Sequence, residues 1–145
     1  MSLWIGRVKL VLDTNVLVSA LLTKDTPPDQ LYQAWQAHRF ALAISTWQIN
    51  ELRRVLGYEK LQPYINGFEA SLLLENIDSM AEIVDVSIPR TESPDPDDNW
   101  ILACAVTSQA DLLVTGDKND LLQLKQVAGV QIVNARQALE QVCRN

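Results

Sequence analysis

Four carboxylates occupy places in the sequence where a strand ends or a helix runs close to such an end. Asp13 directly follows a β-rich apolar run, and Asp117 comes shortly after another. Asp98 opens an apolar stretch after an irregular loop, and Glu51 lies within a stretch of helical periodicity. Residues just past the carboxyl ends of parallel strands line one crevice of an open sheet. We therefore expect Asp13 and Asp117 to face one pocket, which Asp98 and Glu51 can also reach.

Carboxylates gathered in one pocket repel one another, and each raises the pKa of its neighbours. A bound cation offsets this repulsion, and oxygen ligands favour Mg²⁺ or Mn²⁺ over zinc, which prefers His and Cys. His38 is the only histidine in the chain, so a site that needs two histidines is excluded, and we interpret His38 as a surface or packing residue. Metal ions held by carboxylates activate water and stabilise a leaving oxygen, so phosphodiester hydrolysis needs no nucleophilic side chain.

Short β-like runs alternate with amphipathic helical stretches, which favours a layered α/β fold around a parallel sheet. The predicted strands are residues 8–12, 40–44, 82–86, 112–115 and 130–133. The predicted helices are residues 16–22, a helix capped by Asp29 that runs to about 38, a helix capped by Ser45 that ends near 57, one or two within 61–80, one capped by Asp97 or Asp98, and residues 135–142.

The length of 145 residues predicts a single domain over residues 1–145, large enough to bury a core without staples. Cys104 and Cys143 match neither a disulfide framework nor a zinc motif, and no apolar run is long enough to cross a membrane. The N-terminus lacks the apolar stretch of a signal peptide, so we expect a cytoplasmic protein.

The formal net charge of -6, taken alone, argues against nucleic-acid binding, because phosphate contacts usually come from a basic surface. Acids that converge on metal ions lose part of this negative charge when the metal binds. A small basic set then remains to contact a nucleic-acid backbone. Its candidates are Arg7, Lys9, Lys24, Arg39, Arg53, Arg54, Lys60, Lys118 and Lys125.

Four segments of the sequence resemble the motifs of the PIN-domain family. The first motif is matched by VLDTNVL at residues 11–17, the third by DDNWILACA at 97–105, and the fourth by LVTGDK at 113–118. Residues 45–56, with Glu51, match the second motif, which is only a helix that carries an acid. The four together, in this order and spacing, are specific. The resemblance runs nearly end to end and is closest to bacterial PIN proteins described as toxins of toxin–antitoxin pairs.

The resemblance implies a three-layer α/β/α fold with a central parallel sheet of about five strands in the order 3-2-1-4-5. It also implies an endoribonuclease that depends on Mg²⁺ or Mn²⁺ and cuts RNA, expected to be single-stranded, together with a homodimer and an antitoxin partner. Carried over by motif, the metal-binding and catalytic acids are Asp13, Glu51, Asp98 and Asp117. The groups that would orient those acids are Thr14, Asn15 and Thr115.

The sequence departs from the family pattern at two places. Related sequences often have an acid directly after the lysine of the fourth motif, whereas here Asn119 intervenes and Asp120 follows, as either a fifth acid or a helix cap. Before the third motif, Glu92 and Ser93 stand where a basic residue is common, which puts RNA contact at this loop in doubt.

The third motif leaves a choice among three neighbouring acids. Asp98 has the spacing to the following apolar residues that fits the motif best, and Asp95 and Asp97 are the alternatives. Each acid also has a purely structural explanation, because Asp97 and Asp98 are good N-caps and a lone Glu51 is most often a solvated helix residue. The convergence of all four on one crevice favours the metal site over these explanations.

Two other enzyme classes fit the sequence less well. A phosphatase of the haloacid-dehalogenase type also begins with an Asp after its first strand, but it needs a second Asp two residues later, where this chain has Asn15. Dinucleotide binding is disfavoured because no glycine-rich loop follows the first strand. The competing hypothesis from a different class is a catalytically silent PIN-like module that binds RNA or a protein partner.

Overall fold

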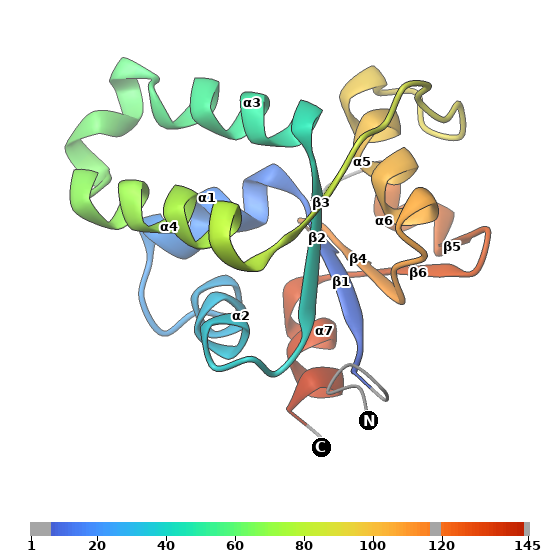
Figure 1. The fold of residues 1–145 in the computed structure, drawn as a ribbon, viewed down its shortest axis with the longest axis horizontal. Coiled ribbons are helices and arrows are strands. Elements are labelled where there is room, and N and C mark those ends of the chain that lie inside the picture. Colours follow the sequence, from blue (N-terminus) through green and yellow to red (C-terminus); the bar gives the residue numbers. More distant parts are fainter. Residues whose placement is uncertain (1–6, 117–119, 144–145) are drawn as a thin grey trace.

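The computed structural model describes residues 7–116 and 120–143, which form a six-stranded sheet with helices on both faces (Figure 1). The strands are β1 (Lys9–Leu12), β2 (Ala41–Ser45), β3 (Glu82–Val84), β4 (Leu112–Val114), β5 (Gln126–Val127) and β6 (Val130–Val133). Their order is β3-β2-β1-β4-β6-β5, with parallel pairing everywhere except between β5 and β6. The five predicted strands therefore occur in the expected order 3-2-1-4-5, β6 being the fifth.

Strand β5 is the one strand of the described sheet that the sequence analysis did not predict. It has only two residues, which is too short for an alternating pattern to be recognised. Ala128 and Gly129, both with positive φ, turn the chain back so that β5 pairs antiparallel with β6 at the sheet edge. A glycine suits this turn because it adopts positive φ without steric cost.

The helices are α1 (Thr14–Leu22), α2 (Pro27–Gln36), α3 (Thr46–Leu56), α4 (Gly67–Met80), α5 (Pro96–Thr107), α6 (Asp120–Leu124) and α7 (Ala135–Val142), with a 3-10 helix at Glu59–Tyr64. In Figure 1 they lie on both sides of the central sheet, with α1, α2 and α4 on one side and α5 and α6 on the other. In the part of the chain that the structure describes, no helix combines the length and apolarity needed to cross a bilayer.

Successive residues of the central strands face two separate hydrophobic clusters. Leu10 and Leu12 of β1 pack into the cluster that includes residues of α1, α2, α4 and α7. Val11, between them, packs into the other cluster, with residues of α5 and α6. Side chains alternate across a strand, so a strand buried on both faces reads as a continuous apolar run. This is why residues 10–12 of β1 are all apolar and show no polar alternation.

Helix α2 begins earlier than predicted, so the assignment of Asp29 as its N-cap is wrong. Thr26 is the N-cap, and Pro27 occupies the first turn, where a missing N–H costs nothing. The Asp29 carboxylate is buried within that turn and accepts hydrogen bonds from the Asp25 N–H at 2.9 Å and Gln33 Nε2 at 2.8 Å. It stabilises the turn before the helix instead of the helix end itself.

Helix α5 also begins earlier, and neither Asp97 nor Asp98 is its N-cap. Asp95 is the N-cap, and its Oδ1 accepts a hydrogen bond from the Asp97 N–H at 2.9 Å, with Pro96 as the first helical residue. Because Asp95 does the capping, the Asp98 carboxylate is not needed at the helix end.

The predicted start and end of α3 are confirmed. Ser45 Oγ accepts a hydrogen bond from the Gln48 N–H at 3.1 Å, and Gly57 is the C-cap. Helix α7 begins with a capping box, in which Asn134 Oδ1 accepts from the Gln137 N–H and Gln137 Oε1 accepts from the Asn134 N–H. Both helices therefore start at fixed points just past the ends of β2 and β6.

Candidate functional site

Three of the four predicted acids line one cleft at the carboxyl end of the central strands. Asp13 follows β1 directly, Glu51 comes from the middle of α3, and Asp98 comes from the first turn of α5. The cleft has a volume of about 470 Å³ and is open to solvent. The fourth acid, Asp117, lies outside the described residues.

Asp13 is buried at the base of this cleft, with 7% of its surface exposed. Although it is the N-cap residue of α1, its side chain makes no capping hydrogen bond. Instead, Thr115 Oγ1 donates a hydrogen bond to Asp13 Oδ2 at 2.8 Å, from the residue that follows β4. The pKa of Asp13 is raised to about 6, mainly by burial; the Thr115 hydroxyl lowers it, and the charges of Asp98 and Glu51 make smaller contributions that raise it.

Asp98 is equally buried, whereas its neighbours Asp95 and Asp97 are exposed. Ser93 Oγ donates a hydrogen bond to Asp98 Oδ2 at 3.2 Å. Ser93 is itself fixed, because its N–H donates to Asn99 Oδ1 at 2.9 Å and its carbonyl accepts from Asn99 Nδ2 at 2.8 Å. The loop before α5 therefore folds back onto the helix and places a hydroxyl beside the acid.

Ser93 is a residue of the site that the sequence analysis noted only as a departure from the family pattern. The neighbouring Glu92 points its charge elsewhere, because its carboxylate pairs with the Arg90 guanidinium at 2.6 Å. This pair holds the pKa of Glu92 at about 2, through the Arg90 hydrogen bond. The loop thus adds no uncompensated acid to the cleft at position 92.

Glu51 lies at the mouth of the cleft and is half-buried. Its Oε1 accepts a hydrogen bond from Thr14 Oγ1, which ties α3 to the first residue of α1. Burial raises the pKa of Glu51, the Thr14 hydroxyl lowers it, and the charge of Asp97 raises it. Glu51 is therefore held in the cleft instead of extending into solvent.

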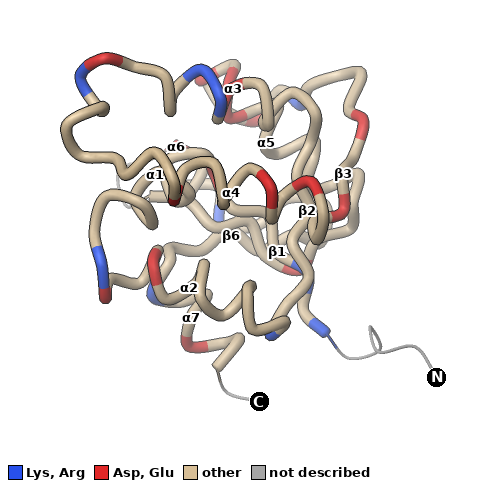
Figure 2. Tube along the Cα trace, turned by 60° about the vertical axis from the view of Figure 1, so that its left-hand side comes forward, with Lys and Arg blue, Asp and Glu red and all other residues tan. Residues whose placement is uncertain are grey.

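A basic and aromatic rim borders the cleft at the end of α3. Arg54 and Tyr58 line the cleft, and Arg54 Nη1 donates a hydrogen bond to the Tyr58 hydroxyl. Lys60 Nζ lies 5.9 Å from the centre of the Tyr58 ring. Figure 2 shows acidic and basic segments next to each other along α3. Arg54 and Lys60 belong to the predicted basic set, but Tyr58 was not singled out, because a lone tyrosine carries no spacing signal.

Three other members of the predicted basic set either form ion pairs or lie far from the cleft. Lys9 pairs with Glu82 at 2.8 Å, and Lys24 pairs with Glu69 at 3.0 Å. Arg39 precedes β2 and so lies at the opposite end of the parallel strands from the acids. Lys118 falls outside the described residues, as does Asn119.

Two contacts hold the helices of the site onto the strand that carries Asp13. Gln48 Nε2 donates a hydrogen bond to the Leu12 carbonyl at 2.6 Å, which fixes the start of α3 to the end of β1. Trp47 of α3 stacks on Trp100 of α5, with ring centroids 5.8 Å apart and planes 13° apart. The positions of Glu51 and Asp98 are therefore set by packing between three elements.

Of two further predicted residues, Asn15 lines the cleft and Asp120 does not. Asn15 is exposed, and a Cβ at Gly116 would lie 3.2 Å from Asn15 Nδ2. A larger residue at position 116 would therefore require the Asn15 amide to shift by a few tenths of an ångström. Asp120, the possible fifth acid, is exposed at the first position of α6.

A sequence profile of the PIN domain matches residues 9–119. The chain belongs to the PIN-domain family. Members of this family are in general nucleases that depend on divalent metal ions. The match covers all four acids and ends where the fourth motif ends.

Individual proteins resemble this PIN domain at lower identity. The uncharacterized protein MJ1680 of Methanocaldococcus jannaschii is 28% identical over 124 residues, which are 82% of this chain and 76% of that protein. The crystal structure of PAE2754 from Pyrobaculum aerophilum has a TM-score of 0.56 at 19% identity, covering 96% of this chain and 91% of that one.

Two further solved structures share the fold. VapBC2 from Rickettsia felis, bound to a DNA fragment from their promoter, has a TM-score of 0.57 at 23% identity. FitAcB from Neisseria gonorrhoeae has a TM-score of 0.54 at 18% identity. Each alignment covers 88% of this chain and 98% of the other. At these identities the likeness establishes the fold of the PIN domain and nothing finer.

The side chains of the cleft suit a divalent cation of the kind that PIN domains use. The carboxylates of the cleft offer oxygen ligands for a metal ion. A bound cation would relieve the repulsion between Asp13 and Asp98. Within residues 7–116 and 120–143, however, no group of three or more His, Cys, Asp or Glu side chains is arranged to hold a metal. Mg²⁺ is commonly held by one or two carboxylates together with water and substrate phosphates. The pair of Asp13 and Asp98 fits that mode of binding.

Proposed function

We propose that this PIN domain is an endoribonuclease that hydrolyses phosphodiester bonds of single-stranded RNA with Mg²⁺ or Mn²⁺. The observation that carries the proposal is the burial of Asp13 and Asp98 in one cleft, close enough for the charge of Asp98 to raise the pKa of Asp13. Burying two carboxylates without a cation costs free energy, and a bound metal ion would offset that cost.

In this proposal Asp13 and Asp98 bind the metal, and Asp117 and Glu51 complete the set of acids around it. A bound divalent ion lowers the pKa of a water molecule and stabilises the leaving oxygen. Thr115 and Ser93 hold Asp13 and Asp98 in the orientation that ligation needs, through the hydroxyl hydrogen bonds described above.

Glu51 is assigned a second task beside the metal. Its Oε1 accepts a hydrogen bond from Thr14 Oγ1, and because Glu51 lines the cleft we assign its other carboxylate oxygen, Oε2, as a proton acceptor. A pKa raised by burial makes this carboxylate a stronger base, so Oε2 would take the proton of the attacking water. Arg54, on the same cleft wall, would contact the phosphate that is cut.

The test is cleavage of a mixed pool of single-stranded RNA with Mg²⁺, with Mn²⁺ and with EDTA. We expect cutting with either metal, none with EDTA, and a loss of roughly a hundredfold or more in Asp13→Asn. Asp78→Asn is the matched control, because Asp78 is an exposed acid of α4, remote from the cleft residues. Full activity of Asp13→Asn would refute the site.

The competing proposal is a catalytically silent module that binds RNA or a protein. It is favoured if carefully purified wild type binds Mn²⁺ and RNA but cuts neither this pool nor longer structured RNA. Cleavage separates the two proposals, and calorimetric titration with Mn²⁺ then shows whether a protein that does not cut has kept the metal site, in which case Asp13→Asn should weaken Mn²⁺ binding.

We also propose an antitoxin partner and a homodimer, as the two similar structures named for their complexes suggest. The exposed apolar side chains Phe68 and Tyr64, with 76% and 71% of their surfaces exposed, offer a surface for such contacts near the start of α4. Light scattering of the purified chain, alone and mixed with the product of a neighbouring gene, measures both associations. A monomer that binds no such product would contradict this part of the proposal.

A further inference from the structure

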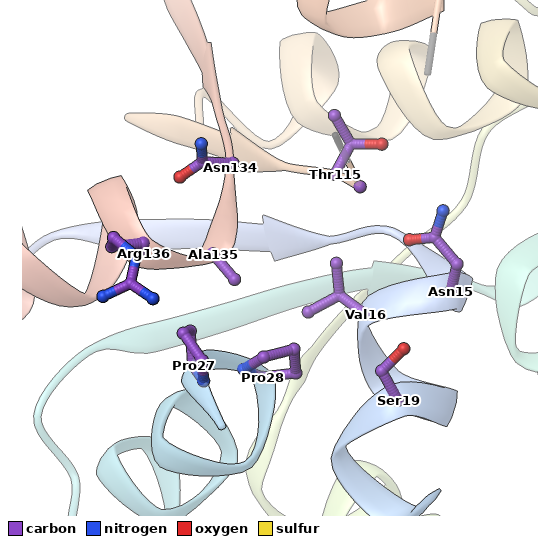
Figure 3. A pocket seen from close by; sticks show the side chains of 10 residues that line it. Asn15, Val16, Ser19, Pro27, Pro28, Thr115, Asn134, Ala135 and Arg136 are labelled. Atoms are coloured by element: carbon purple, nitrogen blue, oxygen red, sulfur yellow. The ribbon is translucent and has the colours of Figure 1, made fainter. Parts of the chain in front are cut away.

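A second cavity of about 410 Å³ lies beside the carboxylate cleft (Figure 3). The two share Asn15 and Ser19 of α1, so they are neighbours on the same edge of the sheet. In Figure 3, α1 and α2 supply the lower walls, and Arg136 and Ala135 of α7 close the cavity on the side away from Asn15. Its volume lies within the range of small-molecule pockets.

The chemistry of the second cavity differs from that of the cleft. Among its described lining residues, Arg136 is the only charged one. Arg136 is exposed, and no carboxylate of the described chain pairs with it. On a chain with a formal net charge of -6, an unpaired arginine beside a metal site is suited to bind an anion.

The remaining walls combine flat apolar surface with hydrogen-bonding groups. Pro27, Pro28 and Ala135 provide the apolar part. Asn134 uses its Oδ1 to cap α7, which leaves its Nδ2 as a donor, and Ser19 contributes a hydroxyl. Unstacked nucleobases are recognised in single-stranded RNA by apolar walls and by polar groups of this type.

One residue of the second cavity is hydrogen-bonded to a residue of the cleft. Thr115 lines the second cavity, while its Oγ1 donates to Asp13 Oδ2 at 2.8 Å. An occupant of the second cavity therefore contacts the residue that orients a buried acid of the cleft. A chain bound through both spaces would have one phosphate at the acids and its next nucleotide in the cavity.

We infer that the second cavity is the subsite for the nucleotide next to the cleaved phosphodiester, with Arg136 binding the phosphate on the far side of that nucleotide. This inference rests on the proposed ribonuclease function. The subsite makes a neutral-to-basic path for RNA beside an acidic centre. Arg136 is absent from the basic set predicted from the sequence, because an isolated arginine after the last strand carries no charge pattern.

The test measures binding of a short single-stranded RNA of mixed sequence in the Asp13→Asn background, which prevents cleavage. We expect Arg136→Gln to weaken binding about tenfold and to lower the slope of log affinity against log salt by about 0.7, the value for one phosphate contact with a single strand. Arg136→Lys should restore much of the affinity. Arg39→Gln is the matched control, since it removes the same charge from the opposite end of the strands.

A second variant tests the shape of the subsite without changing charge. Ala135→Leu places a larger side chain into the cavity and should weaken binding of the same RNA by about tenfold, with an unchanged melting temperature. Equal affinities and salt slopes for Arg136→Gln and Arg39→Gln would overturn the inference, even in an enzyme that cuts RNA. Arg136-dependent binding by a wild type that never cuts RNA would support the second cavity as an RNA-binding site but refute the nuclease proposal, and with it the position next to a cleaved bond.

Discussion

The two neighbouring cavities differ in the charges of the side chains that line them. The carboxylate cleft gathers Asp13, Glu51 and Asp98 and raises the pKa of Asp13 and Glu51. The second cavity has Arg136 as its one charged lining residue within the described chain. The cleft is suited to a cation and the second cavity to an anion. Net charge therefore says little about the ligand of this PIN domain, because the two kinds of charge are separated within one edge of the sheet.

The strongest test of this comparison is to substitute a buried acid and an exposed acid of the cleft in separate variants. Asp98→Ala should lower RNA cleavage by roughly a hundred- to a thousandfold, whereas Asp97→Ala should change it less than about threefold. The reason is that Asp98 is buried and accepts a hydrogen bond from Ser93, whereas Asp97, which also lines the cleft, is exposed. Single-turnover cleavage of the same RNA measures both, and the reverse order would move the ligand to Asp97.

The burial of Asp13 among other carboxylates should also affect the free energy of unfolding, which is measured without substrate. The pKa of Asp13 is raised from 3.8 to about 6, so the folded protein binds a proton there more tightly than the unfolded chain. Ionisation of Asp13 therefore lowers the free energy of unfolding as pH rises from 3.8 to about 6, by at most about 3 kcal/mol, and the cost stays constant above that range. The cost is absent below pH 3.8.

Asp13→Asn should remove this cost. Without metal, the variant should be more stable than wild type at pH 8, and the difference should shrink to nothing near pH 4. Urea unfolding across that range measures it, with Asp78→Asn as the control. A variant that is less stable at pH 8 would mean that the carboxylate is satisfied by its neighbours rather than destabilised by them.

Substitution of Thr115, which lines the second cavity and donates a hydrogen bond to Asp13, should have a smaller effect on RNA cleavage. Thr115→Val removes the hydroxyl that lowers the pKa of Asp13. Cleavage at neutral pH should fall about tenfold, and the acid limb of the pH–rate profile should move to higher pH. Thr115→Ser keeps the hydroxyl and should restore both rate and profile. A rate loss with an unmoved profile would show that Thr115 only fills space.

The positions of most strands and helices follow from local patterns, whereas the order of the strands in the sheet was implied by the resemblance to the PIN-domain family. Residues buried on both faces of a parallel sheet are continuously apolar, so β1, β2 and β4 stand out, and Ser45 and Gly57 delimit α3 by their capping preferences. The first residue of a helix is harder to predict from the sequence where several acids and prolines could each occupy the N-cap or the first turn. Thr26 and Asp95 are the caps of α2 and α5 because a proline follows each as the first helical residue.

The sequence by itself determined the alternation of strands and helices, the acids that follow them and the family to which they belong. Only the tertiary structure decided that Asp98 is buried and Asp97 exposed, because each step along a helix turns the side chain by about 100° and the neighbouring loop supplies Ser93 to one of them. It also decided that Arg136 and Asn15 line one cavity, since α7 packs beside α2. Contacts between segments more than a hundred residues apart leave no trace in local spacing.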